Sequence, residues 1–245
     1  REHWVNKPLP GVCRADIIEF RDRRLLFVKP DTFKRQMNII RSAVRMASEE
    51  WGWESYVELF QNIRLPNQNE RQVRRITPRI EGRLMTGTEG GRNPFMKPLI
   101  ILALETGMRR SELLSLKHED WDVRSSLISI KETKNGKNRV IPASNRARQT
   151  LCNLAQNNAH SLIPMSGNAV NLSFQRLKRR TGLDWLRFHD LRHEAISRMF
   201  ECGLSVPEVK SISGHKQLAQ LENYVTVDKE RLRLKISGSQ ESNIE

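Results

Sequence analysis

Seven consecutive residues, 188–194, concentrate groups that suit the binding of a phosphate. The stretch reads Phe-His-Asp-Leu-Arg-His-Glu, which places two imidazoles, a guanidinium and two carboxylates beside an apolar run. Asp190 is suited to cap a helix that begins there, because its carboxylate accepts backbone N–H groups of the first turn. His189 and Arg192 are three residues apart, so a helix brings them to one face, where an imidazole and a guanidinium fork fit a phosphate. If this stretch is considered by itself, the alternative is a polar helix N-terminus that has no catalytic or binding role.

Four further breaks in the expected regular structure each carry one reactive side chain, namely Arg109, Lys134, His215 and Tyr224. Arg109 follows a glycine and lies on a tight connection between two apolar helical stretches. The pair Asn135-Gly136 predicts the turn of a β-hairpin, because both central positions of a type I′ turn need a positive φ. Lys134 and Lys137 flank that turn, and Lys134 is the preferred candidate of the two.

His215 and Tyr224 are nine residues apart, which is about half a turn out of alignment at roughly 100° per residue. One unbroken helix therefore points the two side chains to opposite faces. If both act on one ligand, the chain must bend between them, and Tyr224 must sit on a separate short helix. The chain has only two tyrosines, and Tyr56 falls in the N-terminal helical part, so Tyr224 has little competition as a nucleophile.

The hydrophobic periodicity predicts that helices position most of these groups. Helices are expected at 14–26, 32–52, 98–105, 111–117, 168–180 and 189–201, with further starts at Thr77-Pro78 and at a capping box from Ser205. Two short strands are expected at 127–131 and 139–141. The fold class predicted is therefore mainly α with a small antiparallel β-sheet.

The helix expected at 32–52 is apolar on one side and basic on the other. Its apolar positions recur at spacings of three and four, and they are Phe33, Met37, Ile40, Val44 and Ala47. The other side carries four basic residues, Lys34, Arg35, Arg41 and Arg45. A helix divided in this way suits docking onto a nucleic-acid backbone.

A polar, basic stretch without periodicity follows at 62–77 and includes Arg71, Arg74 and Arg75. It is expected to link a first part, 1–61, to a second part, 78–245. Such a segment suits a strap along a phosphate backbone, and a solvated tether fits the same composition equally well. The chain of 245 residues begins with Arg rather than Met, so its N-terminal part is expected to be incomplete.

The formal net charge of +14 favours a polyanionic partner, with a solvated basic surface as the alternative. The three cysteines are far apart and form no CxxC or Cys/His cluster, so neither disulfides nor zinc are indicated, and a reducing cytosol fits. The longest apolar run, 98–104, is too short to span a bilayer, and no secretory signal is visible. We therefore expect no membrane, no metal and no cofactor.

The reactive groups resemble those of the tyrosine recombinase, or phage integrase, family in order and spacing. The matching segments are Thr106-Gly-Met-Arg109-Arg-Ser-Glu112-Leu, Thr133-Lys134-Asn-Gly, His189-Asp-Leu-Arg192-His193 and Gly214-His215 followed by Tyr224. Each motif alone is common by chance, whereas five in order are specific. The run that begins at Phe188 also resembles plasmid shufflon-type DNA invertases. One departure is Ser213, where many relatives have leucine, and it is expected to affect packing only.

The resemblance implies a role for each group. Arg109 and Arg192 would hold the scissile phosphate. Tyr224 would attack the phosphorus and form a 3′-phosphotyrosyl bond, and Lys134 would protonate the departing 5′ oxygen.

By the same resemblance, His189 would take the tyrosine proton or share it, and His215 would hydrogen-bond the phosphate. Glu112 would orient Arg109 by a bidentate pair, or else be an ordinary exposed glutamate on a helix. His193 is expected to contact and support the catalytic side chains, or to serve in packing.

The chemistry of these groups also has a physical logic of its own. Two guanidiniums can stabilise the charge that develops on the non-bridging oxygens, as divalent metals do in other nucleases. The sequence offers no acidic cluster near these residues, so metal-independent cleavage is expected. A covalent tyrosine intermediate retains the phosphodiester energy for rejoining, which suits strand exchange rather than hydrolysis.

The resemblance implies a two-domain DNA clamp, with a helical core-binding domain at 1–61, a basic linker at 62–77 and a catalytic domain with a C-terminal tail at 78–245. The implied function is site-specific cleavage and rejoining of double-stranded DNA, for integration, excision or inversion, by protomers in a synaptic tetramer. The implied location is the cytoplasm of a bacterium, on DNA, with the gene carried by the host, a phage or a plasmid. Two alternatives stay open, a type IB topoisomerase-like strand cleavage and a non-catalytic DNA-binding regulator on the same fold.

Overall fold

The chain forms two compact units, Arg1–Gln72 and Val73–Glu245, and each is described by itself. A computed structural model describes residues 7–8, 11–52, 54–61, 63–64, 74–131, 138–157, 161–215, 217–222 and 224. The division between the units falls inside the segment 62–77, which the sequence predicts to be a linker. Most of that segment lies outside the described residues.

The described part of the first unit is helical and comprises α1 (Arg14–Leu25), α2 (Pro30–Trp51) and α3 (Glu54–Phe60). Helix α2 begins at Pro30, two residues before the expected start, because proline in the first turn supplies a suitable φ and its missing N–H is not needed there. It ends at Gly52, whose φ is 71°. Both α1 and α3 contact α2, so this long helix organises the unit.

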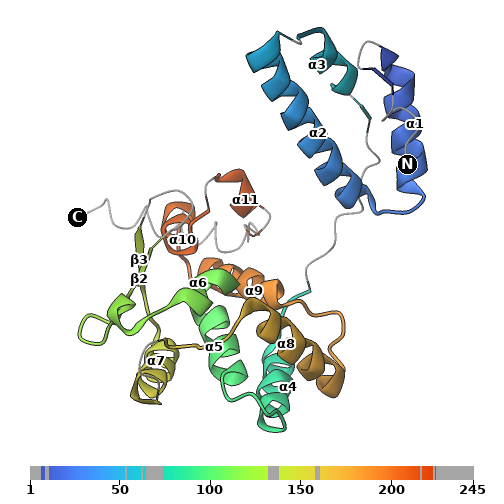
Figure 1. Ribbon diagram of the computed structural model, residues 1–245. Helices are drawn as coiled ribbons and strands as arrows, with labels where there is room; N and C mark the ends of the chain where they lie inside the picture. The colour runs from blue at the N-terminus through green and yellow to red at the C-terminus, as the bar shows by residue number, and fades with distance from the viewer. Residues whose placement is uncertain are drawn as a thin grey trace, which may run out of the picture. The chain divides into compact units, whose positions relative to one another are not determined.

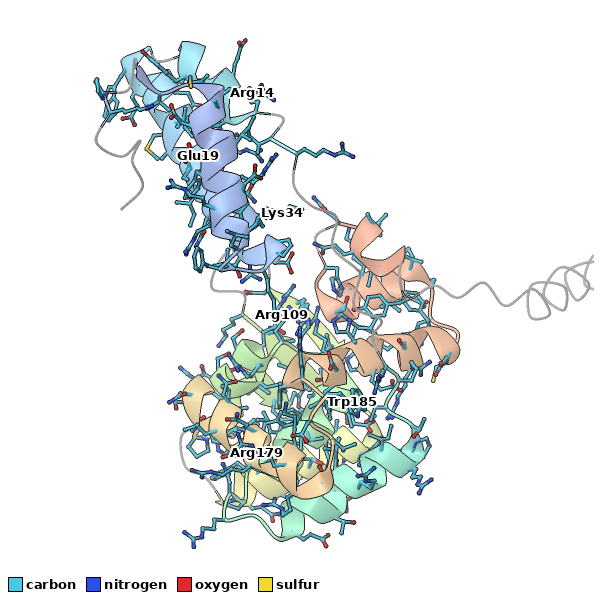
Figure 2. The ribbon with its side chains drawn as sticks, turned by 90° about the vertical axis from the view of Figure 1, so that its right-hand side faces the viewer. Arg14, Glu19, Lys34, Arg109, Arg179 and Trp185 are labelled. Atoms are coloured by element: carbon cyan, nitrogen blue, oxygen red, sulfur yellow. The ribbon has the colours of Figure 1, made fainter. Side chains whose placement is uncertain are left out.

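The apolar face of α2 packs as its spacing predicts. Phe33 and Met37 are fully buried, and they form one cluster with Ile17 and Phe20 of α1 and Phe60 of α3. Burying each such side chain contributes about 1.5–3 kcal/mol. The basic residues Lys34, Arg35 and Arg45 on the other side are exposed, and Figure 2 labels Lys34 on this helix.

The second unit holds most of the helices and all the described strands. Its helices are α4 (Pro78–Glu89), α5 (Met96–Thr106), α6 (Arg110–Ser115), α7 (Asn145–Asn157), α8 (Gly167–Thr181), α9 (Phe188–Glu201), α10 (Val206–Ser213) and α11 (Ala219–Glu222), with a short 3-10 helix η3 (His118–Asp120). Helix α5 contacts α4, α6, α7, α8 and α9, and it lies in the middle of the unit (Figure 1). Its apolar residues are accordingly buried around most of its circumference.

The three described strands form one antiparallel sheet in the order β1 (Trp121–Asp122), β2 (Leu127–Ile130) and β3 (Arg139–Pro142). Ile128 pairs with Ile141, and both side chains are buried. The hairpin predicted between β2 and β3 is therefore confirmed in its strands, while its turn lies outside the described residues. Strand β3 also contacts α10 (Figure 1).

Two left-handed glycines create the breaks on which the site is built. Gly107 ends α5 with a φ of 63°, and Gly214 ends α10 with a φ of 67°. A positive φ favours glycine, because a side chain there meets its own backbone. Each break leaves carbonyl groups at a helix C-terminus without partners inside the helix.

The fold class predicted from the sequence is confirmed, since the described residues are mostly helical with one small antiparallel sheet. No described helix combines the length and the hydropathy that a membrane crossing requires.

Candidate functional site

Arginines from three separate segments converge on the two helix ends formed by Gly107 and Gly214. Arg192, on α9, donates to the carbonyls of Gly107 and Ser213, each at 2.6 Å. Arg109 caps the start of α6 and donates to the carbonyl of Gly214 at 2.8 Å. The unpaired carbonyls at the ends of α5 and α10 thus accept from guanidiniums, as the helix dipole favours.

A third arginine, which the sequence did not single out, completes this arrangement. Arg139, the first residue of β3, donates from Nε to the carbonyl of Ile212 at 3.0 Å. Its two terminal nitrogens bond the Glu112 carboxylate at 3.1 Å and 2.8 Å. Arg139 therefore ties the β-hairpin to α6 and α10. No short motif marks it, because its partners come from other parts of the chain.

Glu112 connects Arg139 to Arg109. Its carboxylate accepts from the Arg109 backbone N–H at 2.7 Å and from Arg109 Nη1 at 2.8 Å. Burial raises the pKa of Glu112, but the hydrogen bonds from Arg139 and Arg109 outweigh it and lower the pKa overall. Glu112 is thus an ionised, largely buried carboxylate that orients two arginines, and the alternative of an ordinary exposed glutamate is wrong.

The site carries an excess of positive charge. The guanidiniums of Arg109 and Arg139 share the carboxylate of Glu112. Arg192 is only 3% exposed, and its described hydrogen bonds go to two backbone carbonyls and to His215. Burial first, and then the nearby charge of Arg109, lower the pKa of Arg192 to about 10. A bound anion would raise the pKa of Arg192 again, because an opposite charge close by favours the ionised form. The electrostatics of the site therefore suit a phosphate.

His215 lies beside Arg192, as the sequence predicts for two groups that serve one ligand. Its Nε2 is 3.5 Å from Arg192 Nη2, and its Nδ1 is 2.7 Å from the hydroxyl of Ser213. Burial, followed by the charges of Arg192 and Arg109, lowers the pKa of His215 to about 4. The imidazole is thus neutral near pH 7. Ser213 is fully buried, and the expectation that it affects packing only is wrong, because its hydroxyl contacts the ring.

Tyr224 reaches the same region from a short separate segment. Helix α10 ends at Ser213, α11 spans Ala219–Glu222, and the Tyr224 backbone N–H bonds the Leu221 carbonyl at 3.0 Å. His215 and Tyr224 therefore do not share one unbroken helix, as the nine-residue spacing requires, although Tyr224 lies in a turn just after α11 rather than on it. Leu221 is fully buried against Ile196 and Val209 and anchors this segment to α9 and α10.

The hydroxyl of Tyr224 is hydrogen-bonded to Nδ1 of His193. The two rings stack with centroids 5.4 Å apart and planes at 21°. His189 meets His193 edge-to-face with centroids 4.8 Å apart. Burial raises the pKa of Tyr224 to about 12, and the charge of Arg192 only partly offsets it. The tyrosine is therefore neutral at rest and needs an acceptor for its proton.

The structure brings together five of the six residues predicted to be catalytic. Arg109, His189, Arg192, His215 and Tyr224 are linked by the contacts above, and Arg109 is labelled among the side chains of the second unit in Figure 2. The sixth, Lys134, lies outside the described residues, as does Lys137. Among the residues that the structure describes, no group of His, Cys, Asp or Glu is placed to hold a metal ion.

The start of α9 differs from the expectation. Its N-cap is Arg187, and Asp190 occupies the third helical position, from which its carboxylate accepts the Arg187 backbone N–H at 2.8 Å. Asp190 thus caps the helix by reaching back, as the acidic residue of a capping box does. The helix starts at Phe188, so His189 and Arg192 both lie in its first turns.

The residues predicted to bind DNA have different local settings. Arg75 pairs with Glu194 and Glu201, and Arg74 lies over the ring of Trp185 with 5.6 Å to the centroid. In the first unit, Arg41 donates to the Phe60 carbonyl at 2.7 Å. Arg71 lies outside the described residues. The exposed Lys34, Arg35 and Arg45 remain as predicted contacts.

Comparisons with known proteins agree with this geometry. The phage integrase family matches residues 74–231. A shufflon-specific DNA recombinase from Escherichia coli is 34% identical over 224 residues, which cover 87% of this chain and 57% of that protein. A putative integrase/recombinase from Haemophilus influenzae is 26% identical over 230 residues, covering 91% of this chain and 75% of that protein. The chain thus spans less than two thirds of the shufflon-specific relative.

Solved structures show the same fold at lower sequence identity. The Tn1549 transposon integrase in complex with circular intermediate DNA has a TM-score of 0.74 at 18% identity, over 94% of this chain and 86% of that one. A lambda integrase dimer bound to a COC′ core site has a TM-score of 0.69 at 18% identity, over 91% and 68%. The family match covers more than half of the sequence and contains the whole arginine, histidine and tyrosine site, so the chain belongs to the phage integrase family.

Proposed function

We propose that this chain is a site-specific DNA recombinase that cleaves and rejoins duplex DNA through a covalent bond between phosphorus and Tyr224. The observation that carries the proposal is the buried, under-neutralised guanidinium of Arg192, which lies with Arg109 and His215 near the partly buried Tyr224. Such a cluster of side chains suits one phosphodiester and places a nucleophile next to it.

In the proposed reaction, the guanidiniums of Arg109 and Arg192 bind the non-bridging oxygens of one phosphodiester. Glu112 and Arg139 hold Arg109 in place before DNA arrives, so little reorganisation is needed during the reaction. His215 adds a hydrogen bond from its ring. Charge that grows on these oxygens in the transition state meets donors that are already oriented.

Tyr224 attacks the phosphorus, and the bond to the 5′ oxygen breaks. The product is a 3′-phosphotyrosyl bond and a free 5′ hydroxyl, which returns in the reverse reaction or is replaced by the 5′ hydroxyl of another strand. Lys134 is proposed to protonate the departing 5′ oxygen. In support, the hairpin that carries Lys134 begins its return strand at Arg139, whose side chain contacts Glu112 of the site.

The two units have separate proposed roles. The first unit and the linker at 62–77 are proposed to bind the DNA backbone, and the second unit to perform the chemistry. The titles of the related structures name integrases with DNA and, for lambda integrase, a dimer on a core site. By extension, we propose that several copies of this chain assemble on DNA as a synaptic tetramer, in the cytoplasm.

Covalent trapping tests the proposed function. Wild-type protein and Tyr224→Phe are incubated with a library of nicked duplexes and resolved on a denaturing gel, and the trapped duplexes are sequenced. The wild type should form a covalent adduct on a defined site, whereas Tyr224→Phe should bind the same duplex and form none, because it lacks the attacking oxygen. An undiminished adduct with Tyr224→Phe, or none with the wild type, contradicts the proposal.

A further inference from the structure

A histidine outside the set of six predicted catalytic residues makes the only described hydrogen bond to the tyrosine hydroxyl. Nδ1 of His193 bonds Tyr224 Oη, and the two rings stack. His189, by contrast, contacts the edge or face of the His193 ring and makes no described hydrogen bond to Tyr224. Within the part of the chain that the structure describes, His193 thus lies between His189 and the nucleophile.

We propose that His193 is the general base that takes the proton of Tyr224 when the tyrosine attacks phosphorus. The inference rests on the proposed function, since it concerns the same cleavage step. It assigns a catalytic role to a residue that the sequence suggests only as a supporting or packing group.

The step balances when it is combined with the proton donor proposed above. The Oη–H bond of Tyr224 breaks, and its proton passes to Nδ1 of His193, which becomes an imidazolium. The electron pair left on Oη forms the bond to phosphorus, and the bond between phosphorus and the 5′ oxygen breaks, with that oxygen taking a proton from Lys134. Rejoining reverses the sequence, so His193 returns the proton to Oη as the phosphotyrosyl bond is cleaved.

The surroundings favour His193 over His189 for this task. Partial burial raises the pKa of Tyr224 to about 12, so the tyrosine keeps its proton unless a base contacts it directly. Among the described residues, His189 has no hydrogen bond to the tyrosine hydroxyl and contacts the ring of His193 instead. A general base must also lie within hydrogen-bonding reach of the proton it removes, and among the described residues His193 meets that condition.

Position on the helix explains why the two histidines differ. His193 is one residue after Arg192 on α9, and its ring contacts Tyr224, which packs on the cluster around Leu221. His189 lies a full turn earlier, next to the helix start. Helix α9 thus carries both Arg192, which is proposed to bind the phosphate, and His193, which contacts the nucleophile. A single rigid helix therefore fixes the position of the phosphate relative to Tyr224.

The test separates a base from a residue that only positions the tyrosine. His193→Asn keeps an amide oxygen near the place of Nδ1, so it accepts a hydrogen bond from Tyr224 but cannot take its proton. His193→Ala leaves room for added imidazole. Single-turnover cleavage of the trapped duplex is measured for both variants and for His189→Ala, with and without imidazole, alongside DNA affinity and thermal melting.

We expect both variants to bind DNA as the wild type does and to cleave about 10²–10⁴-fold more slowly. Imidazole should restore part of the rate of His193→Ala and leave the wild type unaffected. Two results overturn the inference, namely a wild-type rate for folded His193→Asn, or rescue by imidazole of His189→Ala and not of His193→Ala. If the wild type itself forms no adduct, the proposed function fails first, so the two failures are distinguishable.

Discussion

At the residue scale, one carboxylate determines how the arginines of the site are presented. Glu112 is bonded to the backbone and side chain of Arg109 and to both terminal nitrogens of Arg139. Without its charge, two guanidiniums close together would repel each other and lose their common acceptor. The Arg109 side chain is 35% exposed, so losing the ionic bond to Glu112 weakens the restraint on its position, although its bond to the Gly214 carbonyl remains.

Glu112→Gln should therefore slow cleavage by about 10²-fold, the loss expected when a reacting group is misplaced by about 1 Å. DNA affinity should change little, because Arg192 still contacts the phosphate. Single-turnover cleavage rates and gel-shift titrations on the trapped duplex measure the two quantities. Glu119→Gln is the matched control, since Glu119 is an exposed carboxylate on η3 that pairs with Lys131. Equal rates for the two variants would show that Glu112 does not orient the site.

At the scale of elements, α9 carries the site on one side and an ionic network on another. Glu194 bonds Arg75 at 2.9 Å, the Ile76 backbone N–H at 2.8 Å and Arg198 at 3.0 Å. Arg198 in turn bonds Glu81 of α4 at 2.8 Å. The chain just before α4 is thus fastened to the helix that holds Arg192. Glu194 is only 4% exposed, so its charge depends on these partners.

Glu194→Gln should lower the free energy of unfolding at pH 7 by about 1.5–3 kcal/mol, the range for hydrogen bonds to a charged group. Glu201→Gln removes a carboxylate from the same helix and the same partner, but that side chain is exposed, so its loss should cost about 0–1 kcal/mol. Urea unfolding followed by circular dichroism measures both. If the two variants lose the same free energy of unfolding, the burial of Glu194 does not strengthen its ion pair with Arg75.

The dependence on pH gives the same variant a second test. Burial raises the pKa of Glu194, but the bonds from Arg75, Ile76 and Arg198 outweigh it, so the folded-state pKa lies below the ordinary value of 4.5. A depressed folded-state pKa stabilises the protein fully above the ordinary value, and that stabilisation is lost as the pH falls through the folded-state pKa. The difference between wild type and Glu194→Gln should therefore shrink only below about pH 4.5. A difference that shrinks above pH 5 would point to another group.

The elements that could be predicted from the sequence are those whose signal is local. The apolar spacing of α2, the glycine after α5 and the capping box at Ser205 each fix a boundary through neighbouring residues, and the structure has elements at those places. The strands expected on either side of the Asn-Gly pair are present as well. Helix α7 was not predicted, although Ala147, Leu151 and Leu154 recur at spacings of four and three and are buried. Its first turn is basic and polar, so the short apolar stripe does not stand out in the sequence as a helical pattern.

The parts of the site that could not be predicted depend on contacts between distant segments. The sequence marks Arg139 only as the start of a strand, and its place in the site follows from Glu112 and Ile212, which belong to other elements. The sequence marks Ser213 only as a packing residue, because a hydroxyl gives no sign of the ring beside it. The sequence suggests His193 as a supporting group, because its contact with Tyr224 joins residues 31 positions apart. Tertiary contacts decide each of these roles.

At the scale of the whole molecule, the net charge of +14 raises the question of which basic residues bind DNA. Basic side chains that already hold the structure together contribute less, since their charge is partly balanced. Arg75 pairs with two carboxylates, and Arg41 donates to the Phe60 carbonyl. Arg45 is exposed on the same helix as Arg41. The basic side of α2 therefore contains residues of both kinds.

Arg45→Ala should weaken DNA binding and reduce the slope of log Kobs against log[salt] by about one, because one phosphate contact and its released counterion are lost. Lys97→Ala should leave the slope unchanged, since Lys97 is already paired with Glu89 in the second unit. Arg41→Ala should instead lower the melting temperature, because it removes a hydrogen bond inside the first unit. Fluorescence-anisotropy titrations from low to high salt measure the slopes. An unchanged slope for Arg45→Ala, with a reduced slope for Lys97→Ala, would place the DNA contact outside α2, and the charge of this helix would then serve only solubility.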